Sequence, residues 1–242
     1  MTSIELFQSG KLQEAVRALG EEVRNHPQDA KRRTFLFELL CFAGEYDRAA
    51  KHLDILADTN PAAKVGAIVY RSAIQAERVR QKMFADRTYP PARANTRPAG
   101  IRNGAFFTGF SDADSRIGRS LEVFVAGSYT WIALDQIASI VVPPPQRLRD
   151  LLWTPAIVTP KAAYRAMGLG EVFLPVLAPS SWNHSDDLVR LGRCTVWENG
   201  PGSDYVPFGQ KMFLIDDQEV PILELGRVEF SALTGEARVA SA

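Results

Sequence analysis

Two segments of the chain repeat one another at a spacing of 34 residues. Residues 10–15 (Gly-Lys-Leu-Gln-Glu-Ala) correspond to residues 44–49 (Gly-Glu-Tyr-Asp-Arg-Ala), and each segment is followed at the same distance by a proline, Pro27 or Pro61. A period of 34 residues is that of the tetratricopeptide repeat, in which two helices and the turn between them form one unit. The repeat therefore predicts stacked helix pairs in the first part of the chain.

The apolar residues in this part also follow helical spacing. Between residues 12 and 23, and again between residues 46 and 56, they fall three or four positions apart, which places them on one face of a helix. Asp29 is a suitable N-cap for a helix that runs to about residue 43, a short opening helix fits residues 3–9, and a last helix is predicted over 62–84. Two repeats and one helix are close to the minimum for a stable stack, so we expect them to dock against the rest of the chain.

Helical periodicity ends shortly before residue 86. Residues 86–100 contain Tyr-Pro-Pro and Arg-Pro-Ala-Gly, which are typical of a linker. We therefore expect a tetratricopeptide-like helical domain over residues 1–85, a linker over 86–100 and a second domain over 101–242.

The pattern in the second domain is that of β-strands. Alternating residues over 121–125 and 129–133 flank Gly127 and Ser128, which predicts a hairpin. Other strands are expected over 137–142, 171–177, 193–197, 211–215, 220–225 and 227–230, with short helices over 148–153 and 160–167. Strands joined by turns rather than by long helices favour an antiparallel sheet or a small barrel. The predicted fold class is therefore α+β, with the helical repeats first and the β-rich domain second.

The composition narrows the class of protein. Among 242 residues there is no apolar window long enough for a membrane-spanning helix, and the first residues lack the basic and apolar regions of a secretory signal. The two cysteines, Cys41 and Cys194, lie in unrelated segments and suggest no disulfide framework. We expect a cytoplasmic protein that does not insert into a membrane.

The net charge of zero conceals an uneven distribution of charge. Residues 71–102 carry eight lysine and arginine residues, whereas residues 103–242 carry more acidic than basic side chains. One interpretation is an exposed helix and linker kept soluble by charge. The other is a surface that attracts nucleic acid or an acidic partner.

Candidate catalytic and metal sites each lack a requirement. Asp112 and Asp114 begin like a calcium loop, but Arg116 stands at the third ligand position, so a turn capped by the carboxylates is the preferred interpretation. His184 is followed by Ser185 and Asp186, but residues adjacent in sequence do not make a catalytic triad. No zinc, phosphate-loop or dinucleotide motif is present, and we expect no cofactor.

Several motifs together resemble one known family. They are Asp-Ala-Asp-Ser-Arg-Ile-Gly at 112–118, Leu-Arg-Asp-Leu-Leu-Trp-Thr-Pro-Ala at 148–156, Glu-Val-Phe-Leu-Pro-Val at 171–176, Leu-Gly-Arg at 191–193, Gly-Gln-Lys-Met at 209–212 and Arg-Val-Glu-Phe at 227–230. In this order they are similar to the ImpE family, also called TagJ, and the resemblance covers essentially the whole chain. Cys194 stands where the family pattern leads us to expect a second arginine.

The resemblance implies an accessory, non-enzymatic role in a bacterial type VI secretion system. Its implied partners are the small subunit of the contractile sheath and the AAA+ unfoldase that disassembles contracted sheaths. Two other hypotheses stay open from the residues alone. One is an enzyme site around Asp112, Asp114 and His184, which requires these groups to converge in one pocket. The other is nucleic-acid binding through residues 71–102.

Stacked helix pairs commonly bind a peptide in the groove lined by their first helices. The residues of this chain that would line such a groove are Phe7, Arg33, Phe37 and Leu40. The alternative is that Phe37 and Leu40 belong to the core.

Overall fold

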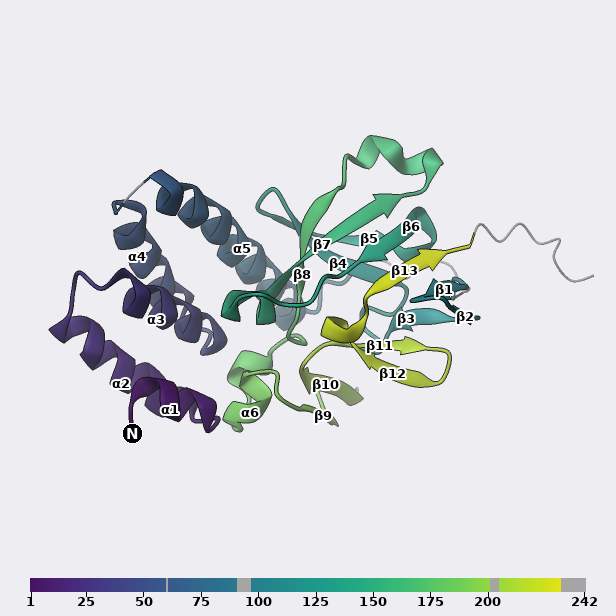
Figure 1. The fold of residues 1–242 in the computed structure, drawn as a ribbon. Helices are drawn as coiled ribbons and strands as arrows, with labels where there is room; N and C mark the ends of the chain where they lie inside the picture. Colours follow the sequence, from purple (N-terminus) through teal and green to yellow (C-terminus); the bar gives the residue numbers. More distant parts are fainter. Residues whose placement is uncertain (60, 91–96, 201–204, 232–242) are drawn as a thin grey trace, which may run out of the picture.

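The computed structural model describes residues 1–59, 61–90, 97–200 and 205–231. Helices make up the first part of the chain and antiparallel strands the second, as Figure 1 shows. Within the described residues the α-helices are α1 (Ser3–Gln8), α2 (Leu12–Asn25), α3 (Ala30–Phe42), α4 (Tyr46–Ala57), α5 (Pro61–Asp86) and α6 (Asp187–Arg190). None of these helices is both long and apolar enough to cross a membrane.

All strands pair in antiparallel fashion. The largest sheet has the order β2-β1-β13-β6-β7-β8-β4-β5, and a three-stranded sheet β12-β11-β3 and a two-stranded sheet β10-β9 lie beside it. The strands are β1 (Gly100–Arg102), β2 (Ala105–Phe107), β3 (Phe110–Asp112), β4 (Ser120–Val125), β5 (Ser128–Ala133), β6 (Ile137–Val141), β7 (Trp153–Pro160), β8 (Glu171–Pro175), β9 (Thr195–Asn199), β10 (Tyr205–Gly209), β11 (Met212–Ile215), β12 (Gln218–Pro221) and β13 (Arg227–Phe230). The prediction of helices followed by an antiparallel sheet is confirmed.

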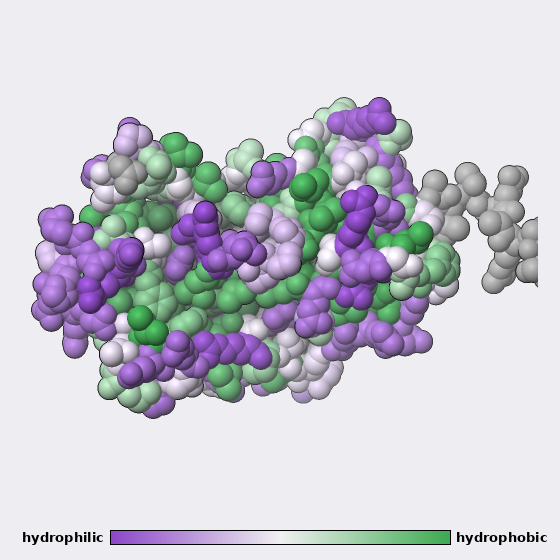
Figure 2. All heavy atoms as spheres, viewed as in Figure 1, coloured by the Kyte–Doolittle hydropathy of each residue, from purple (hydrophilic) through white to green (hydrophobic). Residues whose placement is uncertain are grey.

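The first five helices contact one another in sequence order, each with the next. In α2 the buried positions are those of the predicted apolar face, and α3 begins where the Asp29 side chain accepts a hydrogen bond of 3.0 Å from the backbone N–H of Arg32. Figure 2 shows hydrophilic side chains gathered over the end of the helices that is farthest from the sheets. Whether these pairs belong to the tetratricopeptide class stays a prediction, as do the expected domain limits. Residues 91–96 of the expected linker lie outside the described residues.

The predicted hairpin is present as β4 and β5. Its two-residue turn consists of Ala126 and Gly127, both with positive φ (48° and 80°), rather than of Gly127 and Ser128 as expected. Positive φ at both central positions matches the right-handed twist of the flanking strands, which explains why the turn falls there.

One local expectation was wrong. A strand was expected over 220–225, but β12 ends at Pro221 and a 3₁₀ helix follows over Ile222–Glu224, with Ile222 and Leu225 both fully buried at a spacing of three. The short helices expected over 148–153 and 160–167 form as 3₁₀ helices at Leu148–Leu151 and Ala162–Met167. The strand between them, β7, was not predicted.

β7 accommodates two prolines because its two halves pair with different neighbours. Residues 153–157 pair with β8 and residues 157–160 pair with β6. Pro155 and Pro160 thus each lie in a half that has a single neighbouring strand in register, where a missing N–H donor is tolerated.

The helices and the sheet share a hydrophobic core. Buried residues of α2, α3, α4 and α5 form one cluster with Phe124 of β4, Leu152, Trp153 of β7 and Leu191. Tyr70 of α5 stacks between Trp153 and Phe173, with ring centroids 6.4 and 6.0 Å apart. The expected docking of the helices against the rest of the chain is therefore present, and it buries apolar surface from both parts.

The two glycines of the 34-residue repeat are also docking points. Gly10 and Gly44 both have positive φ (81° and 74°), as the turn before each second helix requires. A Cβ atom at Gly10 would lie 2.4 Å from Leu188 of α6, and one at Gly44 would lie 2.4 Å from the Trp182 ring. Each helical turn thus receives one apolar side chain of residues 181–193.

Polar contacts fix the same segment to the helices. Arg193 donates hydrogen bonds to the carbonyls of Gln8 and Phe7 at 2.8 and 2.7 Å. The Asp187 carboxylate accepts one of 3.0 Å from the backbone N–H of Gln13. The arginine thus caps the end of α1, where the Phe7 carbonyl also accepts a hydrogen bond of 3.0 Å from the backbone N–H of Gly10.

Replacing Gly44 by alanine should destabilise the protein strongly. The substitution combines an unfavourable left-handed backbone with an overlap against Trp182, and we expect a loss of about 2–4 kcal/mol in the free energy of unfolding. Urea denaturation measures this loss. Gly20→Ala is the matched control, because Gly20 lies inside α2 with nothing within 4 Å of its would-be Cβ, and it should be neutral or stabilising by up to about 1 kcal/mol. Equal effects of the two substitutions would contradict the docking role of Gly44.

Candidate functional site

A buried ion pair joins α5 to the sheet. Arg80 of α5 donates to Glu122 of β4 through Nε at 2.8 Å and through Nη2 at 3.1 Å, and the two side chains are 3% and 0% exposed. Two parallel bonds between a guanidinium and a carboxylate fix both distance and orientation. Arg80 also donates hydrogen bonds to Glu77 at 3.1 Å and to the carbonyl of Leu177 at 3.0 Å. Its N–H groups thus contact α5 itself, β4 and the segment after β8.

The same carboxylate reaches two further groups. Lys211, which precedes β11, lies 2.7 Å from Glu122 and also pairs with Asp112 at the end of β3. The hydroxyl of Tyr129 donates to Glu122 at 2.5 Å and in turn accepts from the Trp131 indole. We call Arg80, Glu77, Glu122, Lys211 and Asp112 the buried charge cluster.

The pKa values of the two buried carboxyl groups, Glu122 and Asp112, shift in opposite directions. Burial raises the pKa of Glu122, but the attraction of Arg80 and Lys211 outweighs this effect and holds the pKa at about 2. Burial likewise raises the pKa of Asp112, and here the attraction of Lys211 offsets only part of it, so that the pKa is about 7. Glu122 is therefore the permanent anion of the cluster, and Asp112 titrates near neutrality.

Removing one member of the buried pair should cost much of the protein's stability. Arg80→Met leaves Glu122 without its bidentate partner in a dry environment, and we expect a loss of about 3–5 kcal/mol in the free energy of unfolding by urea denaturation. Arg78→Met is the control two residues earlier on the same helix. Arg78 is 40% exposed and pairs with a solvent-exposed Asp47, so its loss should stay within about 0.5 kcal/mol. A loss at Arg80 no larger than that at Arg78 would show that the pair does not hold the two parts together.

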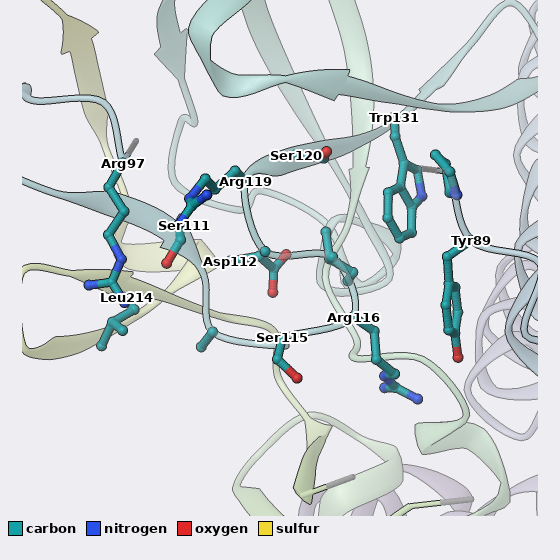
Figure 3. A pocket seen from close by; sticks show the side chains of 14 residues that line it. Tyr89, Arg97, Ser111, Asp112, Ser115, Arg116, Arg119, Ser120, Trp131 and Leu214 are labelled. Atoms are coloured by element: carbon teal, nitrogen blue, oxygen red, sulfur yellow. The ribbon is translucent and has the colours of Figure 1, made fainter. Parts of the chain in front are cut away.

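A cavity of about 470 Å³ opens beside the cluster (Figure 3). Its walls come from the loop at 111–120, from Tyr89 and Pro90, from Arg97, and from Trp131 and Leu214. Asp112 lies in the middle of the view, with Arg97 and Arg119 on one side and Arg116, Tyr89 and Trp131 on the other. Asp112 therefore belongs to both the buried cluster and the cavity wall.

The loop that forms this wall is a turn held by its own carboxylates. Asp112 accepts a bond of 2.9 Å from the N–H of Asp114, and Asp114 accepts one of 3.1 Å from the N–H of Arg116. Asp114 also pairs with the Arg116 guanidinium, at 2.8 Å from its Nε. The prediction of a turn capped by carboxylates is confirmed. The ion pairs that these buried carboxylates form with Lys211 and Arg116 were not predicted.

The stability of the protein should depend on pH through Asp112. Its pKa of about 7 in the folded protein exceeds the ordinary value of 3.8, so the folded protein retains a proton that the unfolded chain has already released between these values. The free energy of unfolding should therefore fall as the pH rises from about 4 to about 7, by up to about 4 kcal/mol for this one site. Urea denaturation across this interval measures the slope.

The control is Asp112→Asn, which keeps an oxygen acceptor for the N–H of Asp114 and removes the titration. The variant is expected to be less stable than the unmodified protein, because a neutral amide then faces Lys211. Its free energy of unfolding should also change less with pH. Burial raises the pKa of Glu38 to about 7 as well, and that contribution is common to both proteins. Parallel curves for the two proteins would contradict the assignment to Asp112.

The residues of the enzyme hypothesis do not meet in one place. His184 bonds Glu198 at 3.2 Å and lines a second cavity, whereas Asp112 lines the first and Asp114 is committed to Arg116. In the described part of the chain, no group of three or more His, Cys, Asp or Glu side chains is arranged to hold a metal ion. The convergence that this hypothesis requires is thus missing.

The four predicted partner-binding residues lie at different depths. Phe37 and Leu40 are 1% and 0% exposed and belong to the core, and Arg33 is 8% exposed and bonds the carbonyl of Pro27 at 2.7 Å. Phe7 is half-buried, packs edge-on against Phe35, lies under the Arg193 guanidinium and lines an apolar cavity of about 310 Å³. Only Phe7 of the four is placed to contact a partner without a rearrangement of the core.

The buried charge cluster was not anticipated from the sequence, although one signal was available. Glu122 and Phe124 alternate with Leu121 and Val123, so they share the second face of β4. A phenylalanine on the same face as the glutamate indicates that other parts of the chain cover this face of the strand as well. The glutamate is then buried and needs a partner of opposite charge.

Comparison with known proteins gives a consistent result. Residues 104–229 match the family described as ImpE protein. The chain is 31% identical to the type VI secretion system accessory component TagJ of Pseudomonas aeruginosa, over 95% of this chain and 91% of that protein. The crystal structure of protein VPA1032 from Vibrio parahaemolyticus has the same fold, with a TM-score of 0.82, 22% identity and coverage of 96% of this chain and 98% of that one.

Proposed function

The chain belongs to the ImpE family, and on this premise we propose that it is a cytoplasmic, non-enzymatic accessory component of a bacterial type VI secretion system. The observation that carries the proposal is the 31% identity to an accessory component of such a system over nearly the full length of both chains. The placement of His184 in a different cavity from Asp112 also favours a binding role over catalysis.

The proposed partner is the small subunit of the contractile sheath, with the AAA+ unfoldase as a second partner that the same protein brings to the sheath. The sheath-binding site we propose is the predicted set Phe7, Arg33, Phe37 and Leu40, with Phe7 as the member that makes contact. The other three residues have a structural role. Phe37 and Leu40 belong to the core against which Phe7 packs. Arg33, on the same helix α3 as Phe37 and Leu40, bonds the carbonyl of Pro27 just before this helix begins. The apolar cavity beside Phe7 offers a place for an apolar side chain of the partner.

Isothermal titration of the full chain with the small sheath subunit from the same secretion system tests the partner. We expect saturable binding in the micromolar range or tighter. Phe7→Ala should weaken it about tenfold or more, as loss of an aromatic anchor does at interface centres. Ile4→Ala is the control on the same helix, because Ile4 is 55% exposed and lies outside the cavity, and it should change the affinity less than about twofold.

An absence of heat and of any saturable binding would remove the sheath subunit as the partner. Full affinity in a folded Phe7→Ala protein would keep the partner and move the site elsewhere. A matching titration with the unfoldase, with and without the sheath subunit, separates an adaptor from a protein that only covers the sheath.

A further inference from the structure

Two cavities on the molecule adjoin one another. The first, of about 470 Å³, holds Asp112 in its wall, and the second, of about 390 Å³, is lined by His184, Glu198 and neighbouring residues. Tyr89 and Arg116 line both. The two hollows therefore adjoin at these two side chains, which stand between Asp112 and His184, and we call the two hollows together the basic groove.

The charges along the basic groove are mostly positive. Four arginines line it: Arg97 and Arg119 in the first hollow, Arg116 between the hollows and Arg87 in the second. The two carboxylates in its walls already have cationic or histidine partners, since Asp112 pairs with Lys211 and Glu198 bonds His184. Guanidinium groups spread along a groove attract a chain that carries several negative charges.

Neutral donors accompany the arginines. Ser111, Ser115 and Ser120 line the first hollow, and Ser180, Asn183 and Ser185 line the second. Hydroxyl and amide groups beside guanidinium groups suit carboxylate oxygens, which accept several hydrogen bonds at once.

The aromatic side chains in the groove are engaged with their neighbours. Tyr89 and Trp131 stack on each other with 18° between their planes, and the Arg116 guanidinium lies 5.0 Å from the centre of the Phe84 ring. Binding of single-stranded nucleic acid depends on aromatic faces on which successive bases stack. The groove lacks that arrangement among its described residues, because its aromatic rings are already packed on one another or on Arg116.

We propose that the basic groove binds an extended acidic segment of a partner protein, whose carboxylates pair with Arg87, Arg97 and Arg119, while Arg116 stays paired with Asp114. Arg87 and Arg97 come from the basic stretch of the sequence, for which an acidic partner was one interpretation. The groove shares no lining residue with the cavity beside Phe7, and the proposal does not depend on the sheath subunit as partner.

Fluorescence anisotropy with a short labelled peptide of alternating glutamate and serine tests the proposal on the full chain. We expect binding that weakens as salt is added, and no binding of the same peptide with glutamine in place of glutamate. Arg87→Gln combined with Arg97→Gln should weaken binding about tenfold, because both residues are exposed and each supplies one charge-assisted contact.

The control is Arg17→Gln combined with Arg165→Gln, which removes the same charge from exposed positions outside the groove and should change the affinity less than about twofold. Arg97→Glu serves as a second variant, in which reversal of one exposed charge should abolish binding while circular dichroism stays unchanged. Three results would overturn the proposal: equal binding of the glutamine peptide, equal losses in the control and groove variants, or no binding of the glutamate peptide at low salt. Tighter binding of an oligothymidylate that displaces the peptide would assign the groove to nucleic acid instead.

Discussion

The pair of Arg80 and Glu122 links segments that lie 42 residues apart, one on a helix and the other in the sheet. Apolar contacts between a helix and a sheet have little directional preference, so a hydrophobic seam alone tolerates sliding. A bidentate ion pair without access to water has essentially one arrangement, because any displacement leaves a buried charge without its partner. Since Lys211 adds a third segment to the same carboxylate, the helices, the hairpin and the last strands are held in one relative position.

This constraint joins two parts of the chain that have different patterns in the sequence. Trp153 and Phe124 lie in the same cluster as the core of the helices, and the Glu77 carboxylate accepts from the Trp153 indole at 3.4 Å. Neither part can form this arrangement without the other. The proposed contacts at Phe7 and along the basic groove share no lining residue, so the two partners would contact separate surfaces of the protein.

The sequence reveals those features whose signal is local. Periodic apolar residues in α2 and the alternation around Gly127 are such signals, and both elements form. β7 was missed because its prolines are tolerated only through pairing partners that are distant in sequence. The candidate site also combines features with a local signal and features without one. The turn at Asp112 and Asp114 was predictable from adjacent residues, whereas the meeting of Arg80, Glu122 and Lys211 depends on the tertiary fold.

The glycines at 10 and 44 give the helical part an unusual limit on its growth. In arrays of helical repeats each unit contacts only its neighbours. Such arrays can therefore lengthen by duplication of a unit, and they bend easily along their length. Here each turn packs against a side chain from elsewhere in the chain, Leu188 for one and Trp182 for the other, within a segment of seven residues. A further helix pair would need another side chain in this segment to receive its turn. The docking thus ties the length of the helical part to the segment that receives its two turns.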